Sequence, residues 1–194
     1  MKIFRNIYEW TLNKAAKKNA FWFLNFVSFV ESSFFPIPPD ILLIPMIIAN
    51  RAKAWFYAFA CTISSVLGGV TGYAIGYFFY NSIGILIVEA YGLSNLFSSF
   101  EEYYNNFGIW IVLGAGFTPF PFKFITIASG VFSLNIFLFI IASILARGLR
   151  FYIIALLLFI FGKKIRYFIE KYFNILITLF FILLIGSVLL VKFI

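Results

Sequence analysis

Residues 31–40 read ESSFFPIPPD and place two carboxylates and three prolines inside a stretch that is otherwise rich in Phe, Leu, Ile and Val. Each proline removes an amide donor and clashes with the preceding helical turn. The prolines at positions 36, 38, 39 and 45 therefore prevent one continuous helix between residues 21 and 48. We interpret residues 21–50 as a re-entrant hairpin, in which two half-helices flank a loop.

The composition of the chain is that of an integral membrane protein. Of its 194 residues, 63% are hydrophobic and only 11% are charged, whereas soluble domains are about 45–50% apolar. A membrane-spanning helix needs about 20 apolar residues. We predict a single membrane domain over residues 1–194, with transmembrane helices at 54–80, 134–161 and 175–193.

The first 20 residues combine apolar and basic side chains and predict an amphipathic helix that lies on an anionic leaflet. We attribute the net charge of +8 to the membrane surface. No nucleic-acid partner is expected, because no RNA- or DNA-binding motif accompanies the charge. The cations of this segment are Lys2, Arg5, Lys14, Lys17 and Lys18.

Enzymatic chemistry has little support in the residue inventory. The chain has one cysteine, Cys61, one aspartate, Asp40, and no histidine. These numbers disfavour a disulfide framework, a zinc site and a thiol–histidine site. An intramembrane protease would need paired aspartates or a Ser–His arrangement. We expect no enzyme, no metal site and no cofactor.

A second proline-containing segment repeats the pattern of the first. Pro-x-Pro occurs at Pro36 and Pro38 and again at Pro119 and Pro121, and we interpret residues 108–132 as a second re-entrant hairpin. Residues 81–107 contain three glutamates and no Lys or Arg, which predicts an external, partly helical loop. The positive-inside rule then places every basic cluster and the N-terminus in the cytoplasm, if the two hairpins enter from opposite sides.

The predicted fold class is an all-α membrane protein. Its centre is an inverted repeat of two re-entrant helical hairpins, each followed by a transmembrane helix. An N-terminal amphipathic helix and a C-terminal transmembrane helix complete it. Broken helices in corresponding positions of two halves indicate a transporter's binding site near the midplane. The glycines between Gly68 and Gly76 predict a close-packing helix face, which also permits a homo-oligomer.

Five charged residues are expected within the membrane, where each costs roughly 2.5–3.5 kcal/mol on insertion scales. Carboxylates and cations that face a cavity would bind a phosphate-bearing headgroup and exchange protons. The alternative is that they form buried ion pairs that only hold the hairpins together. The five residues are Glu31, Asp40, Lys123, Arg147 and Arg150.

Two motifs resemble those of the DedA superfamily, also called VTT or SNARE-associated membrane proteins. ESSFFPIPPD is similar to its Glu-x4-Pro-x-Pro-x-Asp/Glu signature, and GFTPFPFKFITIASG, residues 116–130, is similar to its second, glycine-rich proline motif. Together with the paired arginines of RGLRF, residues 147–151, the pattern most resembles the YqaA-like branch.

The resemblance implies two oppositely inserted re-entrant loops and lipid translocation across the bilayer. It implies that Glu31 and Asp40 couple transport to protons, and that Lys123 stands about where the second motif usually has an arginine. Gly116 departs from the family, because a better-studied branch has another arginine there. Arg147 is our candidate substitute for that missing cation.

We therefore predict a flippase- or scramblase-like lipid translocase in the bacterial inner membrane. Its substrate would be undecaprenyl phosphate or a phospholipid, and the sequence leaves proton coupling open. The first alternative is a non-transporting membrane scaffold with structural ion pairs. The second is an exchanger of small ions or solutes. We expect Glu31 and Asp40 to carry protons, Lys123, Arg147 and Arg150 to bind the headgroup, and Pro36, Pro38, Pro119 and Pro121 to hold the hairpin tips open.

Overall fold

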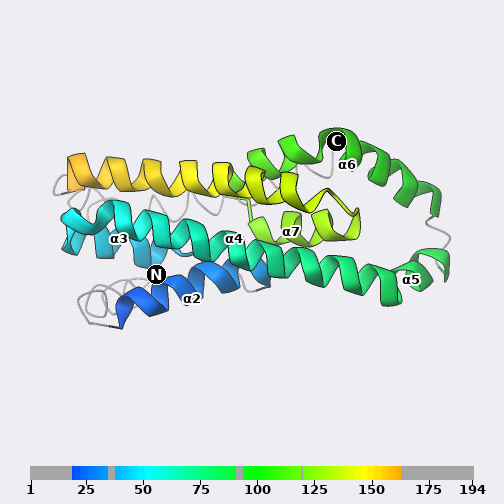
Figure 1. Ribbon diagram of the computed structural model, residues 1–194, viewed down its shortest axis with the longest axis horizontal. Coiled ribbons are helices and arrows are strands. Elements are labelled where there is room, and N and C mark those ends of the chain that lie inside the picture. The colour runs from blue at the N-terminus through cyan, green and yellow to red at the C-terminus, as the bar shows by residue number, and fades with distance from the viewer. Residues whose placement is uncertain (1–18, 35–37, 91–93, 119, 163–194) are drawn as a thin grey trace, which may run out of the picture.

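The computed structural model describes residues 19–34, 38–90, 94–118 and 120–162, and this part of the chain is helical (Figure 1). Two of its helices are long and apolar enough to cross a membrane, Ile136–Gly162 and the run Arg51–Gly84 that contains α4. The elements are α2 (Ala20–Ser33), α3 (Asp40–Ala49), the 3₁₀ turn η1 (Arg51–Lys53), α4 (Ala54–Phe79), the π-helical turn η2 (Tyr80–Gly84), α5 (Ile85–Ala90), α6 (Ser94–Phe117), α7 (Phe122–Val131) and the helix Ile136–Gly162.

The first proline-containing segment is broken, as predicted. The helix α2 ends at Ser33 and α3 begins at Asp40. The chain reverses between them, because Leu24 in the first half of α2 shares a core with Ile47 near the end of α3. Pro45 does not contribute to the break and lies inside α3. A proline there removes only its own amide donor, and the surrounding packing tolerates this local loss.

The second proline-containing segment also separates two helices. The helix α6 ends at Phe117 and α7 begins at Phe122. The two helices run in opposite directions, since the Tyr104 hydroxyl on α6 lies 2.9 Å from the Ser129 hydroxyl near the end of α7.

Residues 81–107, which we predicted to be an external, partly helical loop, are helical over most of the part that the structure describes. The π-helical turn η2, α5 and the first part of α6 occupy this segment, and α6 begins at Ser94 rather than near residue 108. No proline occurs between residues 46 and 118, so no residue of that kind interrupts the helix before Phe117.

Small residues let α4 contact both broken segments. The Ser28 hydroxyl donates to the Cys61 carbonyl and the Ser33 hydroxyl to the Gly68 carbonyl, so α2 runs parallel to α4. A Cβ atom at Gly68 would overlap the Phe29 carbonyl, and one at Gly76 would overlap the Ile127 carbonyl of α7. These contacts confirm the predicted packing role of the glycine face.

The helix Ile136–Gly162 runs antiparallel to α4. At one end the Tyr73 hydroxyl donates to the Leu134 carbonyl at 2.6 Å, and at the other Trp55 stacks on Tyr152. The Asn135 side chain accepts hydrogen bonds from the amides of residues 137 and 138, which starts the helix two residues later than predicted. The hairpins and the two long helices thus lie along one common axis (Figure 1).

Three predicted features fall wholly or largely outside the described residues. They are the amphipathic helix over residues 1–20, of which only the last two residues are described, the basic linker over 163–171, and the final transmembrane helix over 175–193. Pro36 and Pro119 also lie outside them.

Candidate functional site

Arg147 is the centre of the candidate site. It projects from the helix Ile136–Gly162 and is only 1% exposed. Its Nη2 donates to Glu31 Oε2 at 2.7 Å, and its Nε donates to Ser65 Oγ at 2.7 Å. The guanidinium carbon lies 5.2 Å from the Phe122 ring centroid and 4.7 Å from that of Phe151. The guanidinium is thus held by a carboxylate, a hydroxyl and aromatic faces.

Two buried hydroxyls link the same arginine to the same carboxylate by a second route. Ser65 Oγ lies 2.6 Å from Ser32 Oγ, and Ser32 Oγ donates to Glu31 Oε2 at 3.2 Å. Because Ser32 donates its proton to Glu31, Ser65 must donate to Ser32. Hydrogen bonds therefore run in one direction from Arg147 Nε through Ser65 and Ser32 to Glu31. A ring of this kind fixes the orientation of both charged groups.

Arg150 forms the second pair, one helical turn away. Its Nη2 donates to Asp40 Oδ2, and its Nη1 donates to the Thr118 carbonyl at 2.8 Å. Asp40 begins α3, whereas Thr118 follows α6, so one side chain joins the two helix breaks. The other carboxylate oxygen, Asp40 Oδ1, is buried and has no hydrogen-bond partner in the described part of the protein. It can therefore accept a proton or a further donor.

Lys123 does not join either ion pair. It lies on the first turn of α7, and its ammonium nitrogen is 5.3 Å from the Phe124 ring centroid. The described prolines of the two motifs stand where helices begin. The Pro38 carbonyl accepts a bond from the Ile41 amide, and the Pro121 carbonyl accepts one from the Phe124 amide.

Three side chains of the site were not predicted from the sequence. They are Ser65, Phe122 and Phe151, which contact the Arg147 side chain. A serine among closely packed glycines was the available signal for Ser65. Thr126 on α7 is a further link, because its hydroxyl donates to the Ser32 carbonyl at 3.0 Å.

Gly116 lies beside the site and not inside it. A Cβ atom there would be 2.7 Å from the Ala146 Cβ and 3.2 Å from the Phe122 ring. An arginine at position 116 would therefore displace Ala146, which precedes Arg147, and the Phe122 ring, which lies beside the Arg147 guanidinium.

Taken together, two carboxylates and two guanidinium groups converge between the helix breaks. Their formal charges cancel, so the buried group is neutral as a whole. Such a cluster can bind an anion only when a carboxylate is displaced or protonated, since each arginine already has an acidic partner.

Two similar proteins match most of the chain. An uncharacterized protein of Haemophilus influenzae is 37% identical over 164 residues, which cover 84% of this chain and 85% of that protein. An uncharacterized homologue from Histophilus somni is 34% identical over 164 residues with the same coverage. This chain belongs to their family. No family model and no solved structure matches the chain.

The descriptions of these two family members state no activity.

Proposed function

We propose that the chain is an integral membrane protein built as an inverted repeat, each half a re-entrant hairpin followed by a transmembrane helix. In the first half, α2 runs parallel to α4 and α3 returns. In the second, α6 runs parallel to Ile136–Gly162, because Gly108 lies beside Leu134 and Gly116 beside Ala146. The antiparallel direction of the two long helices supports entry of the hairpins from opposite sides (Figure 1).

The proposed location is the bacterial inner membrane, with the N-terminus in the cytoplasm. Arg51 and Lys53 precede α4, whereas Glu101 and Glu102 lie on α6, a helix that extends to the opposite end of the molecule (Figure 1). The basic residues before α4, and the lack of Lys and Arg between residues 54 and 122, support this orientation. Many large apolar side chains are exposed along both long helices, including Leu67, Phe78 and Leu145, and hydrocarbon would cover them.

The proposed activity is translocation of a phosphate-bearing lipid, either undecaprenyl phosphate or a phospholipid. One observation carries this proposal: Arg147 and Arg150 lie one turn apart between the helix breaks, each paired with a carboxylate from the first hairpin. A guanidinium group matches two phosphate oxygens at once. The resemblance of residues 31–40 and 116–130 to DedA motifs supports the same substrate class.

The proposed mechanism is an exchange of partners. When Glu31 or Asp40 takes up a proton, its arginine loses a charged partner and can bind the phosphate instead. Release of the phosphate and of the proton restores the ion pair. Lys123 and the first amides of α7 would add positive charge beside the second helix break. Transport could therefore respond to a proton gradient.

A scaffold without transport activity is the second candidate. The hydrogen bonds of Arg147 to Glu31 and Ser65 favour it, because an acidic partner and a hydroxyl partner stabilise a buried arginine without any ligand. An exchanger of small ions would use the same residues but would not move lipids.

Reconstitution tests the proposal. The protein would be placed in liposomes with fluorescent phospholipids or a fluorescent polyprenyl phosphate, with and without a pH gradient. We expect wild-type protein to move one lipid class, and Glu31→Gln and Arg147→Ala to abolish the movement. Glu101→Gln is the matched control, because Glu101 is an exposed carboxylate on α6.

Each outcome assigns a function. Lipid movement that stops in both site variants but not in Glu101→Gln supports a translocase. Ion flux without lipid movement supports the exchanger. If folded wild-type protein moves neither, the translocase proposal is wrong and the scaffold remains.

A further inference from the structure

An apolar groove of about 320 Å³ lies between α4 and the start of the helix Ile136–Gly162. Its volume is within the roughly 300–1,000 Å³ range of small-ligand sites. Ala74, in its wall, is two residues from both Gly72 and Gly76, so it lies on the other side of the helix from the glycine face. The lining residues are Val70, Tyr73, Ala74, Tyr77, Phe78 and Ile136.

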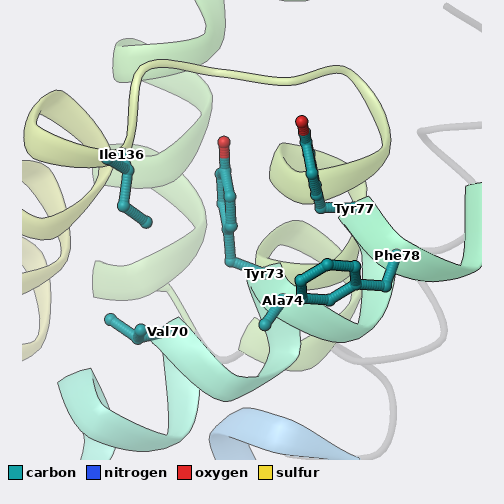
Figure 2. A pocket seen from close by; sticks show the side chains of 6 residues that line it. All are labelled: Val70, Tyr73, Ala74, Tyr77, Phe78 and Ile136. Carbon is teal, nitrogen blue, oxygen red and sulfur yellow. The ribbon is translucent and has the colours of Figure 1, made fainter. Parts of the chain in front are cut away.

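One wall of the groove is held in place by the surrounding fold. The Tyr73 hydroxyl donates to the Leu134 carbonyl at 2.6 Å, and its ring centroid lies 5.4 Å from that of Phe139. The Tyr77 ring is nearly parallel to the Tyr73 ring, with centroids 6.4 Å apart. Figure 2 shows both side chains projecting from α4 in the same direction, toward the connection before Ile136. A wall fixed in advance loses little entropy on binding.

The lining selects a hydrocarbon occupant. None of the six lining residues is charged, and the Tyr73 hydroxyl is already bonded to the protein. Exposed Leu67, Ile75 and Phe78 extend the apolar surface of α4 around the groove. A polar or ionic ligand would lose its hydration there, and the two tyrosine hydroxyls are the only polar side-chain groups among the six lining residues.

The two ends of the groove differ in polarity. The connection that precedes Ile136 carries Ser133 and Asn135, whose side chains are exposed. Val70 lies about one turn nearer the middle of α4 than Tyr73 and Ala74. An amphiphilic molecule would therefore place its polar part beside this connection and its apolar chain along α4.

We infer that this groove binds one hydrocarbon tail of a membrane lipid, with the headgroup beside residues 132–135. The inference rests on the proposed membrane location of α4 and does not require transport. It assigns this part of α4 a selective lipid contact, whose lining residues differ from those of the arginine–carboxylate site.

Photolabelling tests the groove directly. The full-length protein would be reconstituted in phosphatidylethanolamine–phosphatidylglycerol vesicles that contain a phospholipid with a diazirine on its acyl chain. After irradiation, labelled residues would be identified by mass spectrometry. Ala74→Trp fills the groove and Ala74→Leu fills it partly. Leu145→Trp is the control, because Leu145 is exposed on Ile136–Gly162 outside the groove.

We expect labelling of the wild-type protein to concentrate at residues 70–78 and 136. In Ala74→Trp the labelling of these residues should fall about tenfold, which corresponds to a loss of roughly 1.4 kcal/mol of binding free energy. Ala74→Leu should show an intermediate loss, and Leu145→Trp none. Labelling of Leu67 and Leu145 as strong as that of residues 70–78 and 136 would overturn the inference. Cross-links between two copies of the chain through the groove would also overturn it. Lipid transport assayed in the same vesicles separates this result from the proposed function.

Discussion

Ser65 is the residue whose side chain has the clearest testable effect on the site. Ser65→Ala removes the acceptor of Arg147 Nε and the neighbour of Ser32. A buried donor left without a partner costs about 1–3 kcal/mol, and we expect that loss in the free energy of unfolding, measured by denaturant titration in detergent. Thr71→Ala is the control, since the Thr71 hydroxyl bonds only within its own helix at the surface. Equal stability of both variants would contradict a role for the hydroxyl ring.

The pair of Glu31 and Arg147 separates a structural role from a transport role. Each of Glu31→Gln and Arg147→Gln leaves a buried charge without its partner, and we expect each to lower the free energy of unfolding by about 3–5 kcal/mol. The double variant has no unpaired charge there, so its loss should be well below the sum of the two.

Transport of the double variant completes the experiment. If the protein is a translocase, the double variant, in which both groups are neutral, should remain folded but should not move lipid. Full lipid movement by the double variant would show that these two charges serve stability alone. Strictly additive losses of stability would contradict the ion pair itself.

At the scale of helices, the contact between α4 and α7 depends on Gly130. A Cβ atom there would overlap the Tyr73 carbonyl of α4. We expect Gly130→Ala to destabilise the protein by about 1–3 kcal/mol or more, because neither backbone can move freely. Gly114→Ala is the control, because no atom lies within 4 Å of the added Cβ. Because alanine has a higher helix propensity than glycine, we expect Gly114→Ala to leave the free energy of unfolding unchanged or to raise it by up to about 1 kcal/mol. Thermal unfolding should rank the two variants, and an equal effect would contradict the packing interpretation.

The helix breaks could be predicted from the sequence, because proline acts locally. The extent of α6 could not, because Glu, Asn and Ser before residue 108 are compatible with either a loop or a solvated helix. The sequence also indicated Glu31, Asp40, Lys123, Arg147 and Arg150 as one group, of which the first two and the last two form the ion pairs and Lys123 joins neither. Their pairing could not be predicted, since it depends on how helices more than 100 residues apart pack against each other.

At the scale of the whole molecule, the proposed orientation predicts which end of α4 is accessible from each side. Cys61 is fully buried and is the only cysteine, so Cys61→Ala provides a background without thiols. In intact cells, a membrane-impermeant maleimide should label Glu101→Cys and leave Lys53→Cys unlabelled until the membrane is opened. The reverse pattern would contradict the proposed topology, and labelling of both in intact cells would contradict a spanning α4.

The ion pair between Glu31 and Arg147 also sets an order of events during synthesis. Its partners are 116 residues apart, so at about 5–20 residues per second the ribosome adds Arg147 roughly 6–23 s after Glu31. Throughout that interval the first hairpin carries a carboxylate without its cation. We therefore expect the first half of the chain to remain at the insertion machinery or near the membrane surface until the second half has been synthesised. Only then can the first half adopt its final position in the membrane. A chain truncated before residue 147 would be a natural substrate for membrane proteases.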